Sequence, residues 1–281
     1  MYKNIKAILA AIVLAILVAG CGGGGGGAPT TAAVPAAAIA PQTPASTPVA
    51  QKISLPIKLA WRGDSINWGH SLDSLCATGQ RCSPTPAQLE QNHLNTQFGA
   101  GVTLVVDQSA PGSTIKQDLT GTGYFAANEY GNGQPLATVL ATTDQGYSLV
   151  INDSEINDQL VEGDTPDEFQ TDVQNYITTV QAAGMVPIFV EPTAVAPTAI
   201  NSPGENGTWI DATAYVTAEH AAAAMYGTAV APMYSAWINY LDWNVVLLGA
   251  DGVHPTSLGY TFRETQLAST IDAAVQKLLI Q

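Results

Sequence analysis

Five short apolar runs recur along the chain, and most of them end at polar or turn-forming residues. They cover residues 57–61, 102–106, 147–151, 186–190 and 228–230. Runs of this length that are apolar at most positions are typical of strands buried on both faces of a parallel sheet. The pattern therefore predicts a buried sheet with five strands.

The clearest helix lies between the third and fourth runs. Thr165, Pro166 and Glu168 supply a capping box with proline in the first turn. Apolar residues then recur at helical spacing on one face until Gly184, and such a stripe is typical of a helix packed on a core. The stripe consists of Phe169, Val173, Tyr176, Ile177 and Val180.

Two more helices are expected, from about residue 212 to 226 and from about residue 261 to 279. Alternating strands and helices predict a parallel sheet that is covered by helices on both faces. In such sheets the active site lies at the carboxyl ends of the strands. The polar segments that follow the apolar runs are therefore the places to look for chemistry.

The first twenty residues have the layout of a secretory signal peptide. Lys3 and Lys6 precede an apolar run over residues 7–19, which is too short for a comfortable membrane span. Residues 17–21 resemble the bacterial lipobox, in which the cysteine receives lipid after cleavage. The resemblance implies a lipidated Cys21 at the mature N-terminus. The alternative is an ordinary signal peptide followed by an incidental cysteine.

Composition divides the rest of the chain in two. Residues 21–50 are rich in Gly, Ala, Pro and Thr, so we expect a flexible tether there. Residues 51–281 are long enough for one domain with a full hydrophobic core. With residues 1–20 as the signal peptide, we expect export and lipid anchoring at the cell envelope. Gly22, in place of an aspartate after the cysteine, favours the outer membrane if the host has one.

The chain is strongly acidic, with 23 acidic and nine basic residues and a formal net charge of −14 at pH 7. This charge argues against nucleic acid as a partner and favours neutral or cationic substrates. Contact with the membrane is expected through the lipidated Cys21 alone. The sequence leaves the oligomeric state open.

Cys76 and Cys82 are the two cysteines of the predicted domain. In an exported protein, two cysteines so close in sequence are expected to form a disulfide. A cysteine nucleophile is the alternative, but neither cysteine has a base beside it in the sequence. Two cysteines and four scattered histidines do not form a metal-binding pattern, so no metal site is expected.

Two polar segments carry the residue types of a serine hydrolase. Gly63, Asp64 and Ser65 follow the first apolar run, where a tight turn can lift a serine hydroxyl to the edge of the sheet. By itself this tripeptide is also a common turn. Asp251 and His254 lie three residues apart in a loop rich in glycine and proline, so the carboxylate can hold one imidazole nitrogen. Nucleophile, base and orienting acid are the parts of a catalytic triad.

Taken together, residues 63–65 and 251–255 resemble blocks I and V of the GDSL/SGNH hydrolases, and the resemblance extends over about residues 57–279. It implies a three-layer α/β/α sandwich of flavodoxin-like topology and no cofactor. It also implies hydrolysis of carboxylic esters of lipids, carbohydrates or small alcohols. By this resemblance Ser65 is the nucleophile, His254 the base and Asp251 the orienting acid.

The two intermediate blocks of the family have counterparts. Residues 105–114 resemble the second block, in which the amide of Gly112 would serve the oxyanion hole together with the amide of Ser65. Asn157 matches the asparagine of the third block, although Glu155 stands where the family most often has glycine. Asn152 remains a rival for this role because it follows the apolar run directly.

Two other functions stay open at this point. An acyltransferase on the same scaffold would pass the acyl group to a sugar hydroxyl. A non-catalytic lipoprotein with a binding function is favoured by Glu155 and by the polar pair of residues 152 and 153. Of the remaining histidines, His70 lies five residues after Ser65. It is expected on a helix surface or in the core, and the alternative is a place in the lining of the pocket. His93 and His220 are expected in helices.

Overall fold

The computed structural model describes residues 55–71, 80–127, 133–141, 146–196 and 211–280. All of them belong to one unit of the chain, Pro48–Gln281. The predicted signal peptide, Cys21, the tether and Cys76 lie outside the described residues, and those predictions stay predictions.

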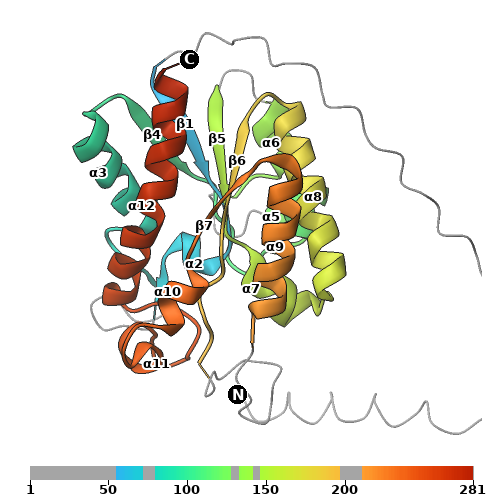
Figure 1. The fold of residues 1–281 in the computed structure, drawn as a ribbon, viewed down its shortest axis with the longest axis vertical. Helices are drawn as coiled ribbons and strands as arrows, with labels where there is room; N and C mark the ends of the chain where they lie inside the picture. Colours follow the sequence, from blue (N-terminus) through green and yellow to red (C-terminus); the bar gives the residue numbers. More distant parts are fainter. Residues whose placement is uncertain (1–54, 72–79, 128–132, 142–145, 197–210, 281) are drawn as a thin grey trace, which may run out of the picture. The chain divides into compact units, whose positions relative to one another are not determined.

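A five-stranded parallel sheet forms the centre of the domain (Figure 1). The strand of this sheet that comes second along the chain lies at one edge, and the strand that comes first lies next to it. This spatial order is the flavodoxin-like arrangement. The predicted α/β/α fold is therefore confirmed, and each apolar run lies within one residue of a strand. In spatial order the strands are β4 (Thr103–Asp107), β1 (Ile57–Trp61), β5 (Tyr147–Asn152), β6 (Val186–Val190) and β7 (Ala229–Ala231).

Helices cover both faces of this sheet (Figure 1). One face is packed by α3 (Pro86–Phe98) and α12 (Ser257–Leu279), and the other by α8 (Pro166–Ala182) and α9 (Thr213–Tyr226). Short elements connect them: α2 (Ser65–Trp68), β2 (His70–Ser71), β3 (Gln80–Arg81), α4 (Ile115–Thr120), α5 (Gly123–Ala127), α6 (Leu136–Ala141), α7 (Glu155–Asn157), the π-helical turn η1 (Asp158–Glu162), α10 (Tyr234–Ile238) and α11 (Trp243–Val246).

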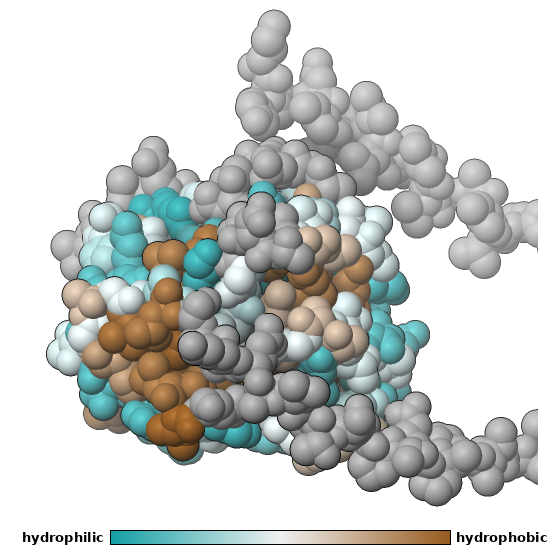
Figure 2. Space-filling model, turned by 90° about the horizontal axis from the view of Figure 1, so that it is seen from above, coloured by the Kyte–Doolittle hydropathy of each residue, from teal (hydrophilic) through white to brown (hydrophobic). Residues whose placement is uncertain are grey.

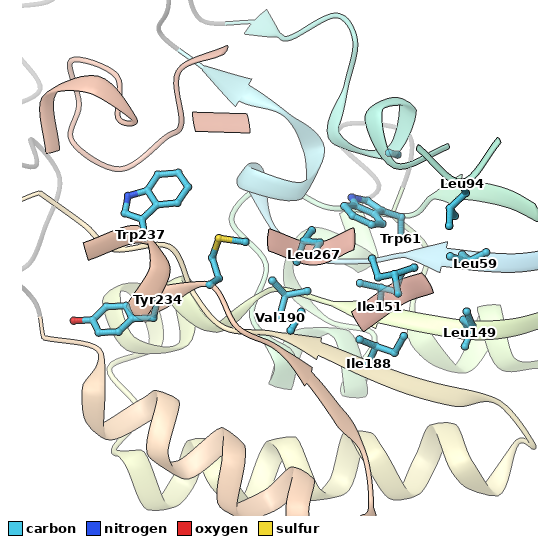
Figure 3. Packing of buried hydrophobic residues seen from close by; sticks show 14 of the residues in the cluster. Leu59, Trp61, Leu94, Leu149, Ile151, Ile188, Val190, Tyr234, Trp237 and Leu267 are labelled. Atoms are coloured by element: carbon cyan, nitrogen blue, oxygen red, sulfur yellow. The ribbon is translucent and has the colours of Figure 1, made fainter. Parts of the chain in front are cut away.

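The strands alternate their side chains between two cores, as the period of two along a strand requires. Leu59 of β1, Ile151 of β5 and Val190 of β6 point to the side covered by α3 and α12, where they meet Leu94 and Leu267 (Figure 3). The intervening residues Ala60, Val150 and Phe189 join the core under α8 and α9. Burial on both faces explains why the sequence shows continuous apolar runs.

Helix α8 follows the sequence prediction closely. The hydroxyl of Thr165 accepts a hydrogen bond from the amide of Glu168, whose side chain accepts one from the amide of Thr165. This capping box and the stripe of fully buried apolar residues, which includes Phe169 and Tyr176, confirm the helix. The helix ends at Ala182, two residues before the predicted stop.

Helix α12 begins four residues earlier than expected, at Ser257 instead of Thr261. Thr256 caps it, accepting a hydrogen bond of 3.0 Å from the amide of Gly259. A Cβ atom at Gly259 would lie 2.2 Å from the carbonyl oxygen of Leu247, so only glycine lets the helix approach the preceding loop. Glycine is a poor helix former, so Gly259 argues against a helix here on propensity alone. Its close packing against the loop at Leu247 outweighs that propensity, and the helix includes it.

A buried ion pair fixes the chain directly after β1. Arg62 is fully buried, and its Nε donates to Asp118 of α4 over 2.8 Å. The hydroxyl of Tyr176 donates to the same carboxylate over 3.2 Å. The guanidinium of Arg62 also lies over the ring of Phe125, 5.0 Å from its centroid. The two partners together satisfy charges that would be costly to bury alone.

No helix in the part of the chain that the structure describes is long and apolar enough to cross a membrane. Seen from above, the surface shows apolar areas beside polar ones (Figure 2). Scattered exposed apolar side chains are ordinary for a folded protein surface.

Candidate active site

Ser65 begins the one-turn helix α2 directly after β1. The Oδ1 atom of Asp64 caps this helix by accepting a 2.7 Å hydrogen bond from the amide of Ile66. Gly63 has a positive φ of 146°, and a Cβ atom there would lie 2.4 Å from the carbonyl oxygen of Asp153. Glycine at this turn is therefore required both by the backbone angle and by the neighbouring strand. The turn leaves Ser65 partly exposed at the carboxyl end of the sheet.

His254 and Asp251 come from the loop between α11 and α12. The Nε2 atom of His254 lies 2.8 Å from the Oγ atom of Ser65, and its Nδ1 atom lies 2.6 Å from the Oδ2 atom of Asp251. The other carboxylate oxygen accepts hydrogen bonds of 3.1 Å from the amides of Val253 and His254. The structure thus brings the three predicted residues into one chain of hydrogen bonds.

The charge of Asp251 decides how His254 is protonated. Burial opposes ionisation, but the hydrogen bonds from His254 and from two backbone amides outweigh it and lower the pKa of Asp251. An ionised carboxylate can only accept hydrogen bonds, so Nδ1 of His254 carries the proton. The lone pair of Nε2 then faces the hydroxyl of Ser65.

Gly112 lies between β4 and α4, with a positive φ of 81°. Its loop is tied to the Ser65 turn, because the amide of Ala110 donates to the carbonyl oxygen of Gly63 over 2.8 Å. A Cβ atom at Gly112 would lie 2.7 Å from the ring of Tyr124. The ring of Tyr124 therefore borders the site at this glycine.

Asn157 of α7 links the other predicted segments. Its Nδ2 atom donates to the Oδ2 atom of Asp64 and to the carbonyl oxygen of Ser113, each over 3.0 Å. Asn152 ends β5, and its side chain lies instead beside Tyr176 of α8. The structure therefore brings Asn157, and not Asn152, beside the residue that precedes Ser65.

Glu155, which stands at the usual glycine of the third block, is almost completely buried. Its carboxyl group lies beside that of Glu219 on α9. Burial, then repulsion from Glu219 and Asp153, raises the pKa of Glu155 well above its ordinary value, and burial does the same for Glu219. Two carboxyl groups buried side by side favour a shared proton, because a proton on one lets it donate a hydrogen bond to the other. Glu155 therefore joins α7 to α9.

Arg263 of α12 is a residue that sequence reasoning missed. It is buried, forms an ion pair with Asp153 and donates to the Oδ1 atom of Asn67 in α2. The amide of Asp64 donates to the carbonyl oxygen of Asp153 over 3.2 Å. Arg263 thus joins the C-terminal helix to the ends of β1 and β5. The sequence carries no signal for this role, because arginine in an amphipathic helix ordinarily faces solvent.

The expected place of His70 on a helix surface or in the core is wrong. His70 lies in β2, and its ring contacts that of His254 with centroids 4.3 Å apart. The hydroxyl of Tyr260 donates to the carbonyl oxygen of His70 over 2.6 Å. Burial, then the neighbouring His254, lowers the pKa of His70. Its short distance from Ser65 in the sequence was the one available signal. His93 and His220 lie in α3 and α9, as predicted.

Cys82 follows β3 and is buried and disulfide-bonded. Cys76, the partner that the sequence predicts, lies outside the described residues. The pairing of the two cysteines stays a prediction.

A family model described as the GDSL-like lipase/acylhydrolase family matches residues 63–262. A comparison with curated proteins gave no significant match.

Several solved structures share the fold at low sequence identity. A lipase/acylhydrolase from Enterococcus faecalis is 18% identical and has a TM-score of 0.57, with 78% of this chain and 96% of that chain covered. An inhibitor-bound aryl esterase from M. smegmatis is 18% identical and has a TM-score of 0.58, with 77% and 99% covered. An acetylxylan esterase from Geobacillus stearothermophilus is 16% identical and has a TM-score of 0.54, with 79% and 96% covered. At these identities the likeness shows the fold alone.

The family match begins at the glycine of the Ser65 turn and runs past the loop of Asp251 and His254 into α12. It covers more than half of the 281 residues and includes every segment of the site described above. The chain therefore belongs to the GDSL-like lipase/acylhydrolase family and is a carboxylic ester hydrolase.

Proposed function

We propose that the protein hydrolyses carboxylic esters through a triad of Ser65, His254 and Asp251. The observation that carries the proposal is the chain of hydrogen bonds from Asp251 to His254, 2.6 Å, and from His254 to Ser65, 2.8 Å. Distances in this range suit transfer of a proton from a nucleophile to its base.

In the first half of the reaction the Oγ atom of Ser65 attacks the ester carbonyl carbon while its proton passes to Nε2 of His254. The imidazolium that forms is stabilised by the carboxylate of Asp251. His254 then gives the proton to the oxygen of the departing alcohol, which leaves an acyl group on Ser65. In the second half, water attacks this acyl group with the same base, and the carboxylic acid is released.

The negative charge on the carbonyl oxygen needs hydrogen-bond donors. We assign this role to the backbone amides of Ser65 and Gly112 and to the side-chain amide of Asn157. Both hydrogen atoms of the Asn157 amide have acceptors, in Asp64 and in the carbonyl oxygen of Ser113. One of these bonds would be exchanged for the oxyanion. A single such donor is worth roughly 3 kcal/mol in the transition state.

The substrate class follows from charge and from the borders of the site. The chain has 23 acidic and nine basic residues. This negative charge favours a neutral or cationic ester of a carbohydrate, a lipid or a small alcohol. The ring of Tyr124 lies against Gly112, and the ring of His70 lies against His254. These two rings border the position of the reacting carbon and would contact the ester on two sides.

Hydrolysis of p-nitrophenyl acetate and labelling by a fluorophosphonate probe test this function. The unchanged protein should hydrolyse the ester and take up one probe molecule, and Ser65→Ala should do neither. Ser235→Ala is the matched control, since Ser235 is exposed on α10 and makes no contact with the triad. Ser65→Ala that retains near-normal hydrolysis would overturn the mechanism.

We also propose that the enzyme is exported and held at the cell envelope by lipid on Cys21, with residues 21–50 as its tether. The lipobox-like residues and the glycine-rich segment after them support this location. Mass spectrometry of the mature N-terminus tests it: a diacylated Cys21 is expected, and an unmodified chain that begins elsewhere would contradict the anchor.

A further inference from the structure

Two of the four histidines of the chain meet in the active site, although they lie far apart in the sequence. The rings of His70 and His254 are in contact at an interplanar angle of 66°, with centroids 4.3 Å apart. Asp251 hydrogen-bonds to His254 as well. Each of these three side chains offers one atom that could bind a metal ion, and the three atoms lie within 4.8 Å of one another. Within the described residues, no other group of His, Cys, Asp and Glu side chains meets this condition.

We propose that His70, His254 and Asp251 form a binding site for a divalent transition-metal cation such as Zn²⁺, and that the bound cation reversibly inhibits ester hydrolysis. Imidazole nitrogen and carboxylate oxygen are preferred zinc ligands. Three protein ligands leave a fourth position for water, which is the composition of many accessible zinc sites. The two other histidines each have a carboxylate partner, and neither belongs to a comparable group of donor atoms in the described part of the chain.

The geometry requires a small adjustment before a cation fits. Zinc–ligand distances are about 2.0–2.2 Å, so the donors of a tetrahedral site lie about 3.4 Å apart. The widest donor separation of 4.8 Å would therefore close by about 1.4 Å. The Nδ1 atom of His254 and the Oδ2 atom of Asp251, which lie 2.6 Å apart, would open by about 0.8 Å. His70 is partly exposed, and rotation of its ring can supply this movement.

The backbone already holds the two histidines side by side. The hydroxyl of Ser71, next to His70, donates to the carbonyl oxygen of Pro255, next to His254, over 2.7 Å. The carbonyl oxygen of His70 is held in turn by Tyr260 of α12. These bonds fix the segments that carry the ligands, so binding needs only the side chains to move. Such preorganisation lowers the entropy lost when a ligand binds.

A cation can reach these atoms and is attracted to them. The side chain of His254 is 18% exposed and that of Asp251 is 11% exposed. The formal net charge of −14 raises the concentration of cations near the protein. An accessible site on an acidic protein is the setting in which a divalent cation binds from solution.

Inhibition would follow because the imidazole of His254 cannot accept a proton from Ser65 while it binds a cation. A neutral imidazole has one free lone pair, and the proposed base needs it for the proton of Ser65. Asp251 lies at Nδ1 of His254, so a cation that binds both residues occupies Nδ1. The ring proton is then displaced to Nε2, which has no lone pair left to offer. Ser65 thereby loses its base, and removal of the cation restores it.

Two measurements test the proposal. The first follows ester hydrolysis while ZnCl₂ is added to chelator-treated protein, and then adds EDTA. The second records the visible absorption of tetrahedral Co²⁺ bound to Ser65→Ala, which reports binding in a protein without the proposed nucleophile. We expect inhibition that EDTA reverses and one bound Co²⁺ per chain.

The decisive comparison is between His70→Phe, His70→Ala and His93→Phe, each measured against its own zinc-free rate. Loss of a ligand should raise the inhibiting zinc concentration by about tenfold or more in both His70 variants. His93→Phe is the matched control, because it removes a histidine that lies 2.9 Å from Asp272 on the α3 side of the domain, and its response to zinc should be unchanged.

Equal inhibition in the protein and in both His70 variants would place the zinc elsewhere and overturn the site. Absence of inhibition at millimolar zinc would overturn it too. If the esterase mechanism itself fails, the Co²⁺ spectrum still decides the site: the signal must be present in Ser65→Ala and lost when His70→Ala is added.

Discussion

The side-chain amide of Asn157 donates a 3.0 Å hydrogen bond to the carboxylate of Asp64, the residue before Ser65. Replacing Asn157 by alanine should lower kcat about 10²- to 10³-fold, because one oxyanion donor is lost while the nucleophile remains. Asn152→Ala is the matched control and should leave kcat within a few-fold, since Asn152 lies toward Tyr176. Steady-state kinetics on an activated ester measures both. A larger loss in Asn152→Ala than in Asn157→Ala would show that the third block is misplaced.

The proposed triad of Ser65, His254 and Asp251 predicts a graded set of losses in turnover. Ser65→Ala and His254→Ala should each lower kcat by about 10⁶, and the double variant should be no worse, because the two residues act as one unit. Asp251→Asn should cost about 10⁴, since the imidazole loses its orienting anion. Thermal unfolding should be little changed in all of them. Additive losses in the double variant would contradict a shared role.

The buried pair of Arg62 and Asp118 predicts a large effect on stability. Asp118→Ala leaves a buried guanidinium without its anion and should lower the free energy of unfolding by about 3–5 kcal/mol. The double variant Arg62→Met/Asp118→Leu should recover much of this loss, because it removes both charges together. Urea denaturation followed by circular dichroism measures the difference. If the double variant is as unstable as Asp118→Ala, the loss of stability comes from disturbed packing and not from an unpaired buried charge.

The carboxyl pair of Glu155 and Glu219 predicts that stability depends on pH. Both pKa values are raised in the fold, chiefly by burial, and Asp153, Asp158 and Glu191 add like charge around the pair. The folded protein therefore binds more protons than the unfolded chain. The stabilisation is complete below the ordinary glutamate pKa of 4.5 and is lost as pH rises through the raised values.

Glu219→Gln tests this pair directly. The amide can donate a hydrogen bond to Glu155 without titrating, so the melting temperature should fall less between pH 5 and pH 8 than in the unchanged protein. A difference of 1 kcal/mol corresponds to about 2–4 °C in a domain of this size. Glu168→Gln, at an exposed capping position, is the control and should leave the pH dependence as it is. Identical pH profiles for all three proteins would refute the shared proton.

The predicted disulfide between Cys76 and Cys82 would close a small loop, so its loss should cost about 2–3 kcal/mol. Cys82→Ser should show this decrease in denaturation experiments. Thiol counting under denaturing conditions without reductant should find neither cysteine of the domain free. Two reactive thiols would contradict the predicted pairing.

The sheet could be predicted from the sequence because each strand is buried on two faces and therefore stands out as an apolar run. Helix α8 could be predicted for a similar reason, since its cap and its stripe are local patterns. The start of α12 could not, because Gly259 is tolerated there only through its contact with the loop at Leu247. Such a contact is visible only once the chain is folded.

The same limit applies to the site. Ser65, Asp251 and His254 lie in local motifs and were predicted. A place for His70 in the pocket was only the less favoured alternative, because its contact with His254 depends on β2 and on the hydrogen bond from Ser71 to Pro255. In the sequence Glu155 is only a departure from the usual glycine of the third block. Its role could not be predicted, because its neighbour Glu219 lies on α9, far along the chain.

Ser65 and His254 are 189 positions apart in the sequence, although their side chains are hydrogen-bonded. A growing polypeptide therefore carries the proposed nucleophile long before it carries the proposed base. Under the proposed roles, a fragment that stops before the loop of Asp251 and His254 holds Ser65 without any group to activate it. Such a fragment should be inert toward esters even where its strands have formed.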